Sequence, residues 1–116
     1  MREEQQIQRA ICDYLAAVAP GVLVFAIPNS SRRAPGGKAG NAVPGLLKGV
    51  WDLGLLLPTG VTAYIEVKTR RGKLSDDQIA FGADCEMRGT PHAVAVTIDD
   101  VRRVLADWGV RTREVV

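Results

Sequence analysis

The chain has 116 residues, of which 47% are hydrophobic and 24% are charged, values typical of one globular domain with its own core. This composition excludes a predominantly disordered chain, and no stretch approaches the roughly 20 apolar residues that a membrane helix needs. The N-terminus is acidic and rich in amides, unlike a secretory signal, so we expect a cytoplasmic protein without membrane contact.

The net charge of +2 is distributed unevenly along the chain. Residues 32–73 contain eight basic and two acidic residues, a local net charge of +6, whereas the remainder is net acidic. A basic centre is typical of a surface that binds polyanions, although charge runs also occur on ordinary solvated surfaces. The candidate DNA-binding residues are Arg32, Arg33, Lys38, Lys48, Arg70, Arg71 and Lys73.

Hydrophobic periodicity predicts the first elements. Apolar residues recur at helical spacing over residues 4–18, and residues 22–27 form a continuous apolar run that indicates a buried strand. Residues 28–49 are rich in glycine, proline and basic residues. Because so long a connection inside a small domain is usually functional or mobile, we expect a flexible basic loop.

The second half of the chain predicts a hairpin and then alternating helices and strands. Strands over residues 52–57 and 62–68 flank a proline–glycine turn, and Ser75 to Gln78 fits a helix capping box. We expect that helix to run to about Arg88 and to stop at Gly89.

A strand over residues 93–98 follows, then a helix from an Asp99 N-cap to about Trp108, and a short edge strand over 110–116. The order α-β-β-β-α-β-α predicts one α/β domain over residues 1–116, with a mixed central sheet flanked by helices. The run of Gly36, Gly37 and Lys38 lacks the spacing of a phosphate-binding loop, so no nucleotide cofactor is expected.

Three charged residues should meet on the sheet. Side chains alternate along a strand, so Glu66 and Lys68 point to the same face. Burying both charges costs more than their pairing returns unless another group engages them. Hairpin pairing centred on Thr59 places Asp52 opposite Glu66. The three side chains would then share one patch.

This arrangement favours phosphodiester chemistry. Two carboxylates in contact repel each other unless a cation lies between them, and oxygen ligands favour Mg²⁺ or Mn²⁺. The Val67 backbone carbonyl, between Glu66 and Lys68, offers a further ligand. Lys68 would lower the pKa of a nearby water or neutralise charge that develops on phosphorus. Together these groups predict metal-assisted hydrolysis of a phosphodiester.

Asp52 followed, after a hairpin turn, by Glu66-Val67-Lys68 resembles the PD-(D/E)xK nuclease superfamily, which has an αβββαβ, restriction-endonuclease-like core. The sequence is further similar to the VRR-NUC (virus-type replication-repair nuclease) domain. The matching segments cover nearly the whole chain, as a stand-alone domain would; they are Glu4, Gly49 to Asp52, Glu66 to Thr69, Gly72 to Gln78 and the strand near 93–96.

The resemblance implies that Asp52 and Glu66 are metal ligands and that Lys68 is the catalytic lysine. It also implies a site acid on the first helix and a polar residue, Gln78, that closes the site. Glu4 is favoured over Glu3 for the helix acid because it flanks the apolar face of that helix. The position before Asp52 is commonly proline in this family, and Trp51 there would reshape the rim of the site or offer a stacking surface.

The resemblance implies a Mg²⁺- or Mn²⁺-dependent, structure-specific DNA endonuclease of replication or repair. Its substrate would be branched DNA such as four-way (Holliday) junctions, and stand-alone members resemble dimeric resolvases, so a homodimer is expected. The alternative is a catalytically inactive nucleic-acid-binding module with the same fold, although a binder does not need all three residues of the site. A protein-interaction subunit has no positive feature behind it.

Overall fold

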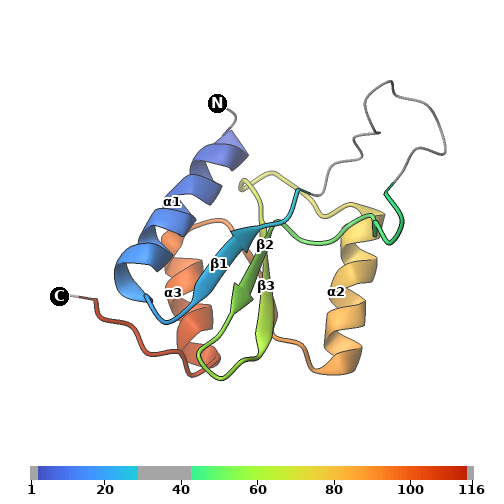
Figure 1. Cartoon of the computed structure of the whole chain (residues 1–116). Coiled ribbons are helices and arrows are strands. Elements are labelled where there is room, and N and C mark those ends of the chain that lie inside the picture. The colour runs from blue at the N-terminus through green and yellow to red at the C-terminus, as the bar shows by residue number, and fades with distance from the viewer. Residues whose placement is uncertain (1–2, 29–42, 115–116) are drawn as a thin grey trace.

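The computed structural model describes residues 3–28 and 43–114. In chain order the elements are α1 (Glu3–Val18), β1 (Leu23–Ala26), β2 (Leu53–Leu56), β3 (Thr62–Val67), α2 (Asp76–Arg88), β4 (His92–Ala95) and α3 (Ile98–Asp107). Helices α1 and α3 lie together on one side of the sheet, and α2 lies on the other (Figure 1). The predicted α/β architecture and element order are confirmed. No helix within these ranges is long and apolar enough to cross a membrane.

The sheet has the order β1-β2-β3-β4, antiparallel except for the parallel pair of β3 and β4. Helix α2 forms the crossover that a parallel pair requires. Leu53 pairs with Ile65, which is the register predicted for a hairpin centred on Thr59. The residues that precede Leu53 and follow Ile65 in the chain, Asp52 and Glu66, are therefore brought together.

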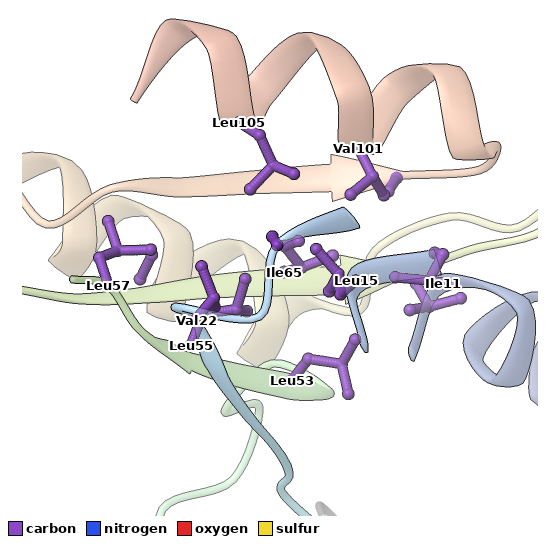
Figure 2. Packing of buried hydrophobic residues seen from close by; sticks show 13 residues of the cluster. Ile11, Leu15, Val22, Leu53, Leu55, Leu57, Ile65, Val101 and Leu105 are labelled. Atoms are coloured by element: carbon purple, nitrogen blue, oxygen red, sulfur yellow. The ribbon is translucent and has the colours of Figure 1, made fainter. Parts of the chain in front are cut away.

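The core lies between the sheet and the α1–α3 pair (Figure 2). Alternate residues of β2 and β3 point into it because strand side chains alternate, and α1 and α3 contribute residues at helical spacing. Fully buried members include Ile11, Leu15, Leu53, Leu55, Ile65, Val101 and Leu105. Each such side chain contributes roughly 1.5–3 kcal/mol, so β3 is held rigidly in the centre of the domain.

Helix α2 has the ends that the sequence predicts. The Ser75 hydroxyl accepts a hydrogen bond from the Gln78 backbone N–H, and the Gln78 side chain accepts one from the Ser75 N–H. At the other end Gly89 adopts φ = 68°, the left-handed conformation that glycine tolerates best. The capping box therefore fixes where Gln78 sits relative to the sheet.

Strand β1 differs from the prediction of a buried strand, because three of its four residues are exposed. It lies at the edge of the sheet. On its outer face, Leu23 is 62% exposed and Phe25 is 40% exposed. A continuous apolar run predicts burial on both faces, but burial also needs a covering layer. None of the described elements covers this end of the outer face.

The C-terminal boundaries also differ from the predictions. Strand β4 ends at Ala95 because the Asp100 carboxylate accepts hydrogen bonds from the N–H groups of Val96 and Thr97. Thr97, rather than Asp99, is the N-cap of α3. Residues 110–114 form no strand. Most of the predicted flexible loop, residues 29–42, lies outside the described residues.

Candidate active site

Three carboxylates converge at one end of the sheet. Glu4 of α1, Asp52 just before β2 and Glu66 of β3 have oxygen atoms that all lie within 4.8 Å of one another. The structure thus brings Glu4, the acid that the sequence favoured over Glu3, to the predicted Asp52–Glu66 pair. Because like charges at this separation repel, the cluster favours a bound cation.

Backbone groups orient the two sheet acids. The Asp52 N–H donates to Glu66 Oε1 at 3.1 Å, and the Val67 N–H donates to Asp52 Oδ2 at 2.9 Å. The Asp52 carbonyl in turn accepts from the Ile27 N–H at 2.8 Å, which ties the start of β2 to the end of β1. These bonds link each carboxylate to the neighbouring strand, so their spacing follows from the hairpin register.

Glu66 is the one polar or charged residue among the described residues that is fully buried, with 1% of its surface exposed. Burial, followed by repulsion from the Asp52 carboxylate, raises the pKa of Glu66 to about 7, and Lys68 opposes this rise. A buried carboxyl group whose charged form is destabilised by a neighbouring acid is typical of functional sites. A divalent cation would supply the missing compensation.

The donor chemistry fits a hard divalent cation. The cluster of Glu4, Asp52 and Glu66 offers oxygen atoms only, the ligands that Mg²⁺ and Mn²⁺ prefer. That the Val67 carbonyl is a further ligand stays a prediction, because the contact of Val67 with the site acids is made by its N–H group, which donates to Asp52.

Lys68 and Gln78 complete the surroundings of Glu66. Lys68 Nζ lies 3.3 Å from Glu66 Oε2, and its backbone N–H donates to the Ala95 carbonyl at 3.0 Å, which fixes the lysine at the exit of β3. Gln78 Nε2 donates to the same Glu66 oxygen at 2.8 Å, while Gln78 Oε1 accepts from the Ser75 N–H at 2.9 Å. One amide thus serves the helix cap with its oxygen and the site with its nitrogen.

Exposed basic residues lie next to Lys68 in the chain. Arg70, Arg71 and Lys73 are exposed in the loop that leads from β3 to α2, and Lys48 is exposed in the segment before β2. Their contact with DNA stays a prediction. The other three predicted contacts fall in the part of the loop outside the described residues; they are Arg32, Arg33 and Lys38.

The interpretation of Trp51 as a stacking surface is wrong. Its side chain is only 3% exposed, packed against the rings of Phe81 and His92 at centroid distances of 6.0 and 5.5 Å. Sequence reasoning missed the partner of this ring, Gly82 of α2. An isolated glycine inside a helical pattern is a signal of close packing, and it was available in the sequence.

No family model matches the sequence, and no curated protein matches it. A solved structure titled "VRR_NUC domain" is similar over 93% of this chain and 99% of its own length, with a TM-score of 0.67 and 21% sequence identity. The chain has the VRR_NUC fold. The resemblance that the Asp52 and Glu66-Val67-Lys68 pattern implied is therefore confirmed for the VRR_NUC fold.

Proposed function

We propose that this protein is a metal-dependent DNA endonuclease that hydrolyses phosphodiester bonds. The observation that carries the proposal is the convergence of Glu4, Asp52 and Glu66 within 4.8 Å, with the Lys68 ammonium 3.3 Å from Glu66, on a VRR_NUC-type fold. A purely structural role for this cluster is unfavourable, because uncompensated buried carboxylates destabilise a fold.

The acids would hold a Mg²⁺ or Mn²⁺ ion, with Asp52 and Glu66 as direct ligands, the Val67 carbonyl as a further ligand and Glu4 at the flank. When bound, such an ion supplies Lewis-acid polarisation of the phosphate. The Asp52 N–H and the Gln78 amide each hold one oxygen of Glu66, so the carboxylate keeps a single orientation. A preorganised site of this kind needs little rearrangement during the reaction.

Lys68 is proposed as the catalytic lysine. Its side chain is 13% exposed, so it is partly shielded from water and still accessible to a substrate at the surface. A partly buried cation next to the scissile phosphate would neutralise the charge that develops in the transition state, or steady a deprotonated water. Its attraction to Glu66 keeps the ammonium at the site before the substrate arrives.

DNA backbone contacts are proposed for the exposed basic residues around the site. Arg70, Arg71 and Lys73 follow closely after Lys68, so a phosphate at the acids would have neighbouring phosphates near this loop. Lys48, with Arg32, Arg33 and Lys38 of the preceding loop, would extend the contact. Such contacts position the duplex and do not read bases, so selectivity would follow the shape of the DNA, in particular branched DNA such as four-way junctions.

A homodimer is proposed because one site cuts one strand, whereas symmetric cleavage of a junction needs two sites related by a two-fold axis. Edge strand β1 supports this proposal. Among the described strands it pairs only with β2, it contains no charged residue, and it exposes Leu23 and Phe25. Unprotected apolar edge strands are favourable sites for pairing with another chain.

The decisive experiment measures cleavage of a labelled four-way junction and of a matched linear duplex with Mg²⁺, Mn²⁺, Ca²⁺ or excess chelator. Cleavage that requires Mg²⁺ or Mn²⁺ and is lost in Asp52→Asn supports the endonuclease. Binding of both DNAs without cleavage under any of these conditions would favour the inactive binding module instead.

A further inference from the structure

The segment before Asp52 is docked on helix α2 through three close contacts. A Cβ atom on Gly49, which has φ = 89°, would lie 2.3 Å from the backbone of Asp77. The Trp51 indole N–H donates to the Gln78 carbonyl at 2.9 Å. One turn further along α2, a Cβ on Gly82 would lie 2.9 Å from Cζ2 of the Trp51 ring. Glycine at these two positions allows the close approach, because any side chain there would hold the segment before Asp52 and helix α2 apart.

With these contacts, a closed chain of hydrogen bonds runs around the candidate site. Trp51 bonds to the backbone of Gln78, the Gln78 amide bonds to Glu66 Oε2, and Glu66 Oε1 accepts from the N–H of Asp52, the residue after Trp51. This closed chain of hydrogen bonds contains three of the proposed site residues, Gln78, Glu66 and Asp52. Its only member with no proposed chemical role is Trp51.

We infer that Trp51 is a positioning residue, which fixes helix α2 so that the Gln78 amide holds Glu66 in its working orientation. The inference rests on the proposed nuclease function for its catalytic consequence. Trp51 is too deeply buried to contact DNA, so its effect on the reaction must pass through its neighbours.

The test combines Trp51→Phe with Gln78→Ala in a double-mutant cycle. Phenylalanine keeps most of the apolar packing but removes the N–H donor and the outer atoms of the ring. A single hydrogen bond is worth about 1 kcal/mol, so Trp51→Phe should lower kcat roughly fivefold and leave KM for DNA unchanged. In the Gln78→Ala background the same change should have little further effect, because the Gln78 amide through which Trp51 acts on Glu66 is already absent.

A second variant tests the ring–glycine contact itself. Gly82→Ala improves helix propensity but collides with the Trp51 ring, so it should lower kcat in the wild-type background. With Trp51→Phe the outer ring atoms are gone, and Gly82→Ala should then cost no activity. Trp108→Phe is the matched control, since this partly buried tryptophan packs against the core from the end of α3.

A readout independent of catalysis is the NMR signal of the Gln78 side-chain amide, identified by its loss in Gln78→Ala. Its protons should be protected from solvent exchange in the wild type and exchange at least several-fold faster in Trp51→Phe, with no change in Trp108→Phe. Unchanged exchange, an effect on KM instead of kcat, or multiplicative effects in the double mutant would each overturn the inference. If the wild type cleaves no DNA, the proposed function fails, and the amide signal still decides whether Trp51 positions Gln78.

Discussion

The Asp52 carboxylate accepts a hydrogen bond of 2.9 Å from the backbone of Val67, the residue that follows Glu66. The Asp52 backbone returns a bond of 3.1 Å to the Glu66 carboxylate. Each acid is thus oriented by the main chain next to the other. The spacing of the two carboxylates is a property of the β2–β3 register and depends little on side-chain freedom.

Lys68→Ala should leave the fold intact and reduce kcat by at least about a hundredfold, because a preorganised cation at developing charge contributes several kcal/mol to catalysis. The measurement is single-turnover cleavage of a labelled junction with saturating enzyme and Mg²⁺. The matched control is Lys73→Ala, an exposed lysine in the same basic segment, which should affect binding more than kcat. Near-normal turnover in Lys68→Ala would remove the role proposed for this lysine.

The metal-free protein should lose stability as pH rises from about 4.5 to 7. The folded-state pKa of Glu66 is raised to about 7, so the folded protein binds a proton that the unfolded chain has already released. This contribution is fully present below pH 4.5, fades through neutral pH and amounts to at most about 3 kcal/mol. Urea unfolding at pH 5, 6 and 8 measures it.

Glu66→Gln is the control for that titration, because glutamine stays neutral and should flatten the pH dependence in the same range. Mg²⁺ should stabilise the wild type more at pH 8 than at pH 5, since it binds the charged carboxylate. An equally steep pH dependence in Glu66→Gln would show that another group causes it.

Neutralising Arg70, Arg71 and Lys73 to glutamine should weaken DNA binding and reduce its salt dependence, with the slope falling by about 0.9 for each phosphate that the protein no longer neutralises. The same triple change at Arg32, Arg33 and Lys38 tests the preceding loop. Arg88→Gln is a control on the far end of α2. If the plot of log affinity against log salt keeps its slope in both triple variants, neither segment contacts the DNA backbone.

Leu23→Lys should dissociate the proposed homodimer by placing a charge on edge strand β1, while the monomer stays folded. Sedimentation velocity at micromolar concentration measures the oligomeric state. Met87→Lys is the matched control, because this α2 side chain is also exposed, at 82%, and lies away from β1. The dimeric form should prefer a four-way junction over a linear duplex. A wild-type monomer that cuts both DNAs equally would contradict the dimer and the branched-DNA preference together.

Local interactions, which can be read from the sequence, determined the hairpin register, the meeting of the two sheet acids and the start of α2. The turn at residues 58–60 sets the hairpin register, which brings Asp52 to Glu66, and strand alternation places Lys68 beside Glu66. The α2 capping box involves residues only three apart, so it too is readable from the chain. These features depend on turn geometry and side-chain period, which act over a few residues and need no knowledge of the rest of the fold.

Contacts between distant elements were decided by the tertiary structure. The approach of Glu4 to Asp52 depends on how α1 packs across the sheet, and the exposure of β1 depends on which faces the helices leave uncovered. The sequence signals close packing through an isolated helical glycine, but only the packing of the segment before β2 on α2 shows that the Trp51 ring is what lies against Gly82. Burial is a property of the assembled layers, so the same apolar residue lies at the surface or in the interior according to what packs over it.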